Sequence, residues 1–366
     1  MTFQLEALEA KYGDSLLLHY GTAAKPRLIV IDGGPKGVYG SSLKPRLDQL
    51  RKGKKLAIDM LMVSHLDDDH VAGVVDLLDE MKEAADENEE APYAIADLWI
   101  NTFQDKLGAD GLAKVAAWVA ANAPKKNATV FAASVAQGRR VRDLAEELAI
   151  PINGDKGLLQ APAEGTKVLK LGTLSLTLLC PNEVRIAKLQ KDWTKHIPKK
   201  KGKANAAAIA LAAAYIDRSV YNLSSIVVLA KQGNKTMLLT GDARGDDIIL
   251  GLEGAGLMKK GKFDCDILKL PHHGSDRNVS TEFFQQVRAK NYVISANGRF
   301  GNPDTPTLEM ITTAREGEKF TIWLTNHEGE LGVKARLDKF FKGDKKKKAY
   351  TVKYRDAKSI GMTITP

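Results

Sequence analysis

The pattern of hydrophobic and polar positions predicts buried strands that alternate with helices. An apolar run at residues 56–63 predicts a buried strand, polar residues follow at 64–70, and a helical pattern covers 71–81. Further strands are predicted at residues 3–8, 15–20, 27–32, 98–101, 224–230, 236–240, 265–270, 292–295 and 320–324. Further helices are predicted at residues 41–50, 111–122, 134–149, 247–257, 281–287 and 307–316. The end of the chain predicts a hairpin around 328–329, a lysine-rich loop at 342–348 and a last strand at 349–353.

Acidic and imidazole side chains gather where the predicted strands end. Four of the seven histidines lie in two such places, residues 65–70 and 272–273. Carboxylates end two other strands, at Asp32 before a Gly-Gly turn and at Asp242 after Gly241. Ligands gathered at strand ends are typical of a metal site.

The densest group is His65, Asp67, Asp69 and His70. Neutral imidazole nitrogens and hard carboxylate oxygens together suit a borderline or hard divalent cation. A solvated acidic turn that caps a helix is the alternative, but it leaves both histidines unexplained. Asp32 is either a residue that orients this group or part of a plain Asp-Gly turn, and its spacing does not separate the two.

Composition places the chain among ordinary globular proteins. It has 366 residues, 44% of them hydrophobic, enough for one large domain or two modest ones. The start lacks a secretory signal pattern, and no apolar run approaches the roughly 18 residues that span a bilayer, so we expect a cytoplasmic protein without a membrane segment. Cys180 and Cys265 are the only cysteines and predict neither a disulfide nor a thiolate zinc site.

The net charge of +9 is compatible with a nucleic-acid partner or with simple solubility. A lysine-rich segment at about 183–205 contains Trp193, and an aromatic ring among lysines can stack on a base. An ordered surface excursion is the alternative for this segment. The candidate nucleic-acid contacts are Lys199, Lys200, Lys201, Lys203 and Trp193.

Four pieces of the chain, in order, resemble the metallo-β-lactamase-fold superfamily. They are Gly13-Asp14-Ser15 with Asp32-Gly33-Gly34, residues 64–73, Gly241-Asp242, and His272-His273-Gly274-Ser275. The Ser-His-x-Asp-x-Asp-His form with His-His-Gly-Ser looks like the nuclease-type domain of ComEC-like DNA-uptake proteins, here without their membrane channel. The resemblance implies an α+β fold, an αββα sandwich of two mixed β-sheets flanked by helices. It also implies a single domain over residues 1–366, with a helical insertion at about 103–150 and the lysine-rich loop at about 183–205.

The resemblance further implies a ligand set for one or two divalent ions. The implied metal ligands are His65, Asp67, Asp69, His70, Asp242, His272 and His273, with Asp242 as the bridging carboxylate. An aspartate at position 67, where the commoner motif has histidine, moves the preference from Zn²⁺ toward Mn²⁺ or Mg²⁺. Supporting positions are expected at Asp32, Asn222 and Ser275, and Asp304 stands in a turn where relatives often carry a histidine.

The expected function is hydrolysis of phosphodiester bonds in DNA or RNA by a metal-activated water. Asp69 and His273 are the expected catalytic residues. Two alternatives remain: the same site acting on a small ester, lactone or phosphorylated metabolite, and a non-catalytic binding protein that keeps the fold.

Overall fold

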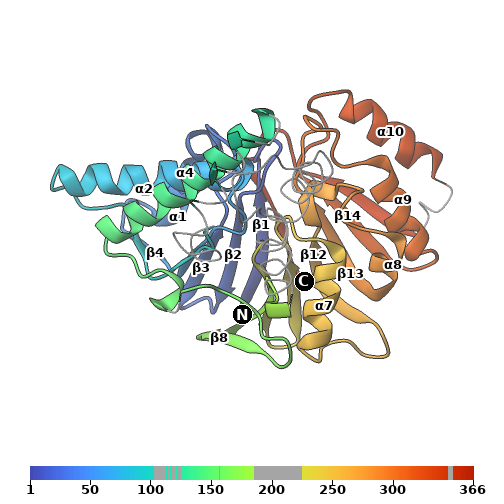
Figure 1. Cartoon of the computed structure of the whole chain (residues 1–366). Helices are drawn as coiled ribbons and strands as arrows, with labels where there is room; N and C mark the ends of the chain where they lie inside the picture. The colour runs from blue at the N-terminus through green and yellow to red at the C-terminus, as the bar shows by residue number, and fades with distance from the viewer. Residues whose placement is uncertain are drawn as a thin grey trace.

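Two β-sheets pack face to face in the computed structural model of the chain, and helices cover both outer faces (Figure 1). The structure describes residues 1–102, 125–155, 157–184, 225–344 and 349–366, with a few positions between 113 and 121. The predicted αββα sandwich is therefore confirmed.

The first sheet has six strands in the order β16-β1-β2-β3-β5-β7. Its strands are β1 (Thr2–Leu8), β2 (Leu16–Gly21), β3 (Pro26–Ile31), β5 (Met60–Met62), β7 (Leu98–Trp99) and β16 (Gly361–Ile364). The pairs from β16 to β3 are antiparallel, whereas β3, β5 and β7 run parallel, so the sheet is mixed. A separate two-stranded sheet pairs β4 (Leu56–Ile58) with β6 (Tyr93–Ile95).

The second sheet has eight strands in the order β15-β14-β13-β12-β11-β10-β9-β8. Its strands are β8 (Lys167–Leu171), β9 (Leu174–Cys180), β10 (Val227–Gln232), β11 (Lys235–Leu239), β12 (Phe263–Lys269), β13 (Val287–Ile294), β14 (Phe320–Leu324) and β15 (Tyr350–Tyr354). Strands β8 to β11 pair antiparallel and strands β11 to β15 pair parallel. This sheet is mixed as well.

A core of aliphatic side chains fills the space between the sheets. Leu5, Leu18, Ile29 and Met62 enter it from the first sheet, and Leu176, Val228, Leu239 and Ile267 enter it from the second. Burial of each such side chain contributes about 1.5–3 kcal/mol. This shared core fixes how the strand ends of one sheet face those of the other.

Three helices of the described residues cover the outer face of the first sheet. They are α1 (Lys44–Arg51), α2 (Asp68–Asp86) and α4 (Lys125–Glu147). Val74 and Leu78 of α2 pack in one cluster with Val141 and Leu144 of α4, at the three- and four-residue spacing of a helix with one apolar face. The predicted helical insertion at about 103–150 thus contains α4 in its described part.

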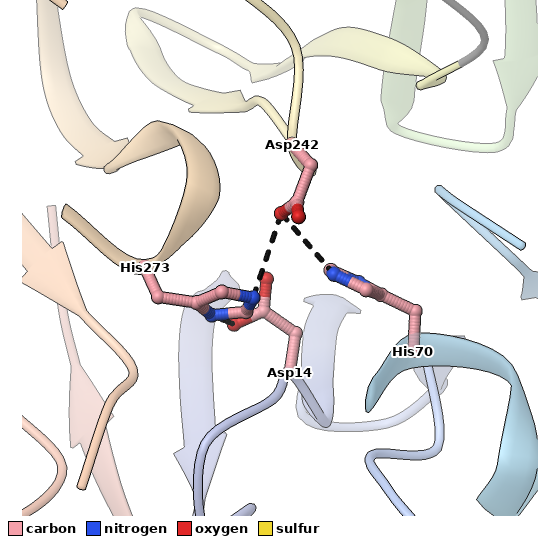
Figure 2. A group of neighbouring side chains, drawn as sticks. All are labelled: Asp14, His70, Asp242 and His273. Carbon is pink, nitrogen blue, oxygen red and sulfur yellow. Dashed lines mark ion pairs between the residues drawn. The ribbon is translucent and has the colours of Figure 1, made fainter. Parts of the chain in front are cut away.

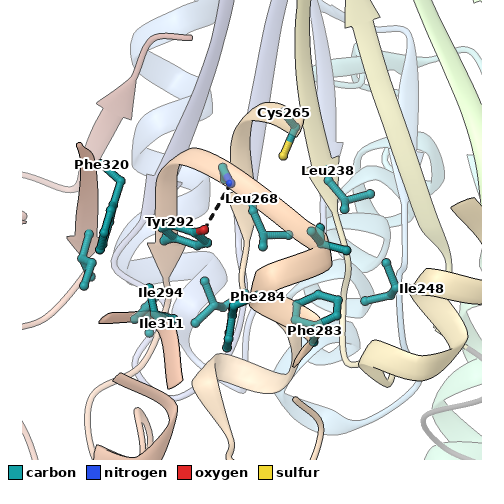
Figure 3. Close-up of a cluster of buried hydrophobic side chains, with 14 of the residues drawn as sticks. Leu238, Ile248, Cys265, Leu268, Phe283, Phe284, Tyr292, Ile294, Ile311 and Phe320 are labelled. Carbon is teal, nitrogen blue, oxygen red and sulfur yellow. Dashed lines mark hydrogen bonds between the residues drawn. The ribbon is translucent and has the colours of Figure 1, made fainter. Parts of the chain in front are cut away.

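In the part of the chain that the structure describes, four helices cover the outer face of the second sheet. They are α7 (Gly245–Gly254), α8 (Thr281–Gln286), α9 (Thr305–Ala314) and α10 (Val333–Gly343). Phe283 and Phe284 of α8 pack beside Tyr292 and Leu268 of the sheet (Figure 3). The rings of Phe284 and Tyr292 meet edge to face at 5.9 Å, a favourable arrangement for aromatic pairs.

The predicted strand at 56–63 is divided, because Asp59 interrupts the apolar run. Its carboxylate accepts hydrogen bonds from the Arg27 guanidinium at 2.6 and 2.9 Å and from the Tyr20 hydroxyl at 2.7 Å. The chain leaves the two-stranded sheet at this residue and enters the first sheet as β5. The helix predicted at 71–81 begins earlier, at Asp68, and ends later, at Asp86.

The hairpin predicted around 328–329 is wrong, and helix α10 follows this turn instead. Val333, Leu337 and Phe341 lie four residues apart and are buried, which is the pattern of a helix with one apolar face. The lysines between them obscured that pattern. Strand β16 was not predicted.

Cys180 and Cys265 are both buried, and no disulfide joins them. None of the helices in the described parts of the chain is both long and apolar enough to span a membrane. Beyond residue 184, the lysine-rich loop at about 183–205 lies outside the described residues. Its boundaries and the single domain over 1–366 stay predictions.

Candidate metal centre

Side chains from four distant segments meet where strands of the two sheets end. Asp14 precedes β2, His70 lies in the first turn of α2, Asp242 follows β11 and His273 follows β12. One ligand atom from each of these buried residues lies within 4.8 Å of the others (Figure 2). Three of the four, His70, Asp242 and His273, are among the residues that the sequence singled out as ligands.

Asp32 holds the ring of His70 from behind. Its Oδ2 lies 2.9 Å from Nδ1 of His70, and its Oδ1 accepts the backbone N–H of Ser64 at 2.7 Å. The Ser64 hydroxyl also donates to Asp32. Because Nδ1 of His70 donates to a carboxylate, Nε2 is the ring nitrogen left to bind an ion, and it faces Asp242. The Asp32 carboxylate therefore lies against the Nδ1 side of the His70 ring.

The glycine turn after Asp32 packs directly against the start of α2. The N–H of Gly33 donates to the carbonyl of His70 at 2.8 Å, and the N–H of Gly73 donates to the carbonyl of Gly34 at 3.0 Å. A Cβ atom on Gly33 would lie 2.3 Å from the nitrogen of Val74, and one on Gly73 would lie 2.1 Å from the oxygen of Gly33. Only glycine fits this approach, which sets the height of His70 above the sheet.

Asp242 is held through its backbone. Its N–H donates to Oγ of Ser225 at 3.2 Å, and its carbonyl accepts Nδ2 of Asn278 at 3.2 Å. The carboxylate therefore stays available on both sides. Oδ1 lies 3.1 Å from Nε2 of His70 and 3.5 Å from Nε2 of His273, while Oδ2 lies 3.6 Å from Nε2 of His272.

The two adjacent histidines occupy a strained turn, Pro271–Gly274. His272 has φ 48° and His273 has φ 56°, both in the left-handed region, which costs non-glycine residues about 1–3 kcal/mol each. Nδ1 of His273 donates to the carbonyl of Ser295 at 3.0 Å, and Nδ1 of His272 donates to Oδ1 of Asn278 at 2.8 Å. Both rings thus present Nε2 toward Asp242.

His273 lies deeper than His272. Its side chain is almost fully buried, and its Nε2 also lies 3.2 Å from Oδ2 of Asp69. The side chain of His272 is 35% exposed. This difference makes His273 the better placed of the two as a ligand and leaves His272 facing solvent.

His65 and Asp67 form a second group beside His70. Nε2 of His65 lies 3.2 Å from Oδ2 of Asp67, and Nδ1 of His65 lies 3.4 Å from Oγ of Ser225. The rings of His65 and His70 are 5.6 Å apart. These two residues are the closest described ligands for a second ion.

The donor atoms fit a divalent ion. Among the described residues, Nε2 of His70, Nε2 of His273 and Oδ1 of Asp242 are buried side-chain atoms without a hydrogen-bond partner. Such atoms are costly in a folded protein unless something pairs with them. A carboxylate oxygen that lies 3.1 and 3.5 Å from two imidazole nitrogens belongs to a suitable set for Zn²⁺ or Mn²⁺.

Asp14 and Lys269 complete the site, and the sequence reasoning gave neither of them a role. Their side chains form a fully buried ion pair, and Oδ1 of Asp14 lies 3.4 Å from Nδ1 of His273. Asp14 therefore sits behind His273 rather than on its Nε2 side, which is a place for an orienting carboxylate. A lysine at the end of the apolar strand β12 was the available signal, because a buried lysine requires an acidic partner.

The acids and bases of the site stabilise each other's charged forms. Burial opposes ionisation of Asp242, but the imidazoles of His70, His272 and His273 outweigh it and hold its pKa well below the ordinary value. Burial likewise opposes protonation of His273, but Asp14 and Asp242 raise its pKa to about 10. Burial also opposes protonation of His70, but Asp242, Asp69 and Asp32 raise its pKa well above the ordinary value.

Other predicted positions lie beside the cluster or outside the described residues. Oγ of Ser275 accepts the N–H of Arg277 at 3.4 Å and so shapes the turn after the histidines. Oδ2 of Asp304 accepts the N–H of Asp276 at 3.0 Å and supports the same turn. Outside the described residues lie Asn222, Trp193, Lys199, Lys200, Lys201 and Lys203.

Comparison with known protein families gives no match to a family model. A stretch of 99 residues, 26% of this chain, is 30% identical to the ComE operon protein 3 of Bacillus subtilis strain 168. The stretch covers 12% of that protein, so the chain corresponds to a small part of it.

Two solved structures are similar to the chain at low identity. Zn²⁺-bound PqqB from Methylobacterium extorquens has 10% identity and a TM-score of 0.41, over 99% of this chain and 100% of its own. The hydrolase AbOPH, in the beta lactamase superfamily, has 15% identity and a TM-score of 0.29, over 63% of this chain and 56% of its own. Because the sequence identities and TM-scores are low, the assignment of a metal rests on the side chains of the site alone.

Proposed function

We propose that the protein is a metal-dependent hydrolase that cleaves phosphodiester bonds in DNA or RNA. The observation that supports it most is the position of the Asp242 carboxylate. Oδ1 faces Nε2 of His70 and His273, and Oδ2 faces Nε2 of His272. A carboxylate with donors on both sides suits one ion with a bound water, or two ions that share it.

The ligands of the first ion would be Asp69, His70, Asp242 and His273, and those of a second would include His65 and Asp67. Bound there, Zn²⁺, Mn²⁺ or Mg²⁺ would lower the pKa of a water molecule and polarise a phosphate oxygen. The oxygen-rich second group favours Mn²⁺ or Mg²⁺ over Zn²⁺.

Asp69, His273 and His272 have separate roles in the proposed reaction. Asp69, with a side chain that is 18% exposed, takes the proton of the attacking water as the new P–O bond forms. The carbonyl of Ser295 accepts the Nδ1–H of His273 and fixes its ring, so that Nε2 stays beside the carboxylates of Asp69 and Asp242. His272 is the exposed imidazole of the site and contacts the leaving oxygen as the old P–O bond breaks.

A polyanionic substrate fits the charge of the chain. Its 54 basic and 45 acidic residues give a net charge of +9, and contacts to phosphates need no base readout. The motif spacing described above and the stretch shared with the ComE operon protein 3 support the ComEC-like, nuclease-type assignment. We place the protein in the cytoplasm as part of this proposal.

The test is cleavage of single- and double-stranded DNA and RNA by the pure protein with Mn²⁺, Mg²⁺ or Zn²⁺. Asp242→Asn and Asp69→Asn are each expected to lower the rate by at least about 100-fold, because each removes a ligand or proton acceptor. Asp264→Asn is the matched control, since Asp264 is exposed near the far end of β12.

Added salt separates the substrate classes. Binding of a polyanion weakens steeply with salt, whereas binding of a small neutral ester hardly changes. Unchanged metal-dependent cleavage in both active-site variants would contradict the proposal.

A further inference from the structure

An aromatic and cationic cluster, exposed at two of its three residues, lies on loops that contact the candidate metal centre. It consists of Tyr12, Arg299 and Phe300, and we call it the aromatic platform. The rings of Tyr12 and Phe300 meet edge to face at 5.1 Å. The guanidinium of Arg299 lies 4.9 Å from the centre of the Tyr12 ring and 6.0 Å from that of Phe300.

The turn that carries Tyr12 contacts the Asp69 segment of the site. The N–H of Asp14, two residues further on, donates to the carbonyl of Asp69 at 3.1 Å. Gly13 lies so close to Asp69 that a Cβ atom there would be 1.9 Å from the same carbonyl oxygen. Burial raises the pKa of Tyr12, and the negative charges of Asp68 and Asp69 add to this effect against that of Arg299. The Tyr12 ring is thus close to the acidic side of the site.

The loop after β13 carries Arg299 and Phe300 and contacts the histidine turn. Nδ2 of Asn302 donates to the carbonyl of His272 at 3.3 Å, and the N–H of Asp304 donates to the carbonyl of Gly274 at 3.0 Å. The same loop therefore supports the histidine turn and carries the two exposed side chains. The two loops of the platform are therefore hydrogen-bonded to the Asp69 segment and to the histidine turn.

Packing within the fold does not account for these side chains. Phe300 is 68% exposed and is the one aromatic among the exposed large hydrophobic residues in the described part of the chain. Arg299 has an ion pair with Glu330 at 3.7 Å, but both side chains are half exposed, and such pairs contribute little. The ring face and the guanidinium therefore remain accessible to a ligand from solvent.

We propose that the aromatic platform stacks a base of a single-stranded nucleic acid, while Arg299 contacts the phosphate beside that base. Aromatic faces stack on bases of any sequence, and an arginine beside them adds charge attraction to the phosphodiester backbone. A duplex hides its base faces, so the platform selects single strands. This inference rests on the proposed function and names the substrate form that the metal centre receives.

The first test is binding without turnover. Fluorescence anisotropy in the presence of a chelator measures affinity for a labelled single-stranded DNA of roughly 12 nucleotides and for an abasic strand of equal length. We expect wild type to favour the strand with bases, and Phe300→Leu to weaken that strand at least about 5-fold while leaving the abasic strand unchanged. Phe300→Trp should retain the preference. Leu331→Ala, which alters another exposed apolar residue, is the control.

The second test is the ratio of kcat/KM on single-stranded DNA to that on duplex of the same sequence. Phe300→Leu and Tyr12→Leu should lower this ratio, and Arg299→Gln should lower the salt dependence of binding. If wild type cleaves neither substrate, the proposed function fails while the binding test still decides the platform. Equal binding of both strands by wild type, or unchanged binding by Phe300→Leu, would overturn the proposed role of the platform. It would not affect the proposed metal centre.

Discussion

Lys269 and Asp14 form an ion pair in which both side chains are 1% exposed. The pair joins the end of β12 to the turn before β2, so it connects the two sheets directly behind His273. Burial opposes ionisation of Asp14, but Lys269 and His273 together hold its pKa below the ordinary value. The carboxylate is therefore charged at any pH at which the protein would be used.

Removal of the lysine should destabilise the protein strongly. Lys269→Met leaves the Asp14 carboxylate buried with a weaker counter-charge, and we expect a loss of about 3–5 kcal/mol in the free energy of unfolding. Urea denaturation measures it. Lys269→Met combined with Asp14→Asn should recover part of the loss, since the unpaired charge is gone. Lys290→Met, at an exposed lysine paired with Asp266, is the control and should cost less than about 1 kcal/mol.

The stability of chelator-treated protein should fall as the pH rises from about 7 to 10. The pKa of His273 is raised to about 10, so its contribution is fully present below the ordinary histidine value near 6.5. That contribution is lost as the pH rises through about 10. His70, whose pKa is raised in the same direction, adds to the slope. Thermal unfolding at a series of pH values measures the slope, and His273→Gln should flatten it. A wild-type profile that rises over this range would contradict the raised pKa.

Metal should stabilise the chelator-treated protein. An ion that binds the folded state adds about 2.7 kcal/mol at a concentration 100-fold above its Kd. Titration with Mn²⁺ and Zn²⁺ during thermal unfolding should show a rising Tm for wild type and for Asp264→Asn. Asp242→Asn should show little or no rise, because the carboxylate between the imidazoles is lost. A full rise in Asp242→Asn would place the ion elsewhere.

Asp32→Asn should weaken metal binding without removing a ligand. The carboxylate fixes the ring of His70 through Nδ1 at 2.9 Å. Loss of such a partner typically lowers metal affinity by about 10- to 100-fold. Competition with a coloured chelator measures the affinity. Asp48→Asn, on the exposed surface of α1, should leave it unchanged.

The contact between the glycine turn and α2 should tolerate no side chain. Gly73→Ala would place Cβ at 2.1 Å from the oxygen of Gly33, so the helix start must shift. Overpacking of this kind costs about 1–3 kcal/mol, and the shift should also weaken metal binding through His70. Gly40→Ala is the control, since no atom lies within 4 Å of the Cβ position there. Equal stability of the two variants would show that the turn can move freely.

The ends of strands were predictable from sequence because apolar runs stop where polar ligands begin. His70, Asp242 and His273 each follow such a run, and the structure brings them together. Boundaries were less predictable, because Asp59 divides one run and the lysines of α10 obscure its apolar face.

The partnership of Asp14 and Lys269 was not predictable in the same way. Lys269 at the end of an apolar strand indicates an acidic partner, but only the packing of one sheet on the other makes Asp14 that partner. The aromatic platform depends on the same kind of long-range placement, since Tyr12 and Phe300 come from opposite ends of the chain.

The pairing of β16 with β1 has a consequence for how the protein is made. Leu5 lies opposite Ile364 in this antiparallel pair, so the first strand of the first sheet lacks one neighbour until residue 364 has been synthesised. Contacts between such distant residues form slowly, because the intervening chain must first be ordered. We therefore expect β1 to keep one open edge until β16 has emerged from the ribosome, so the β1–β16 pairing forms late in folding.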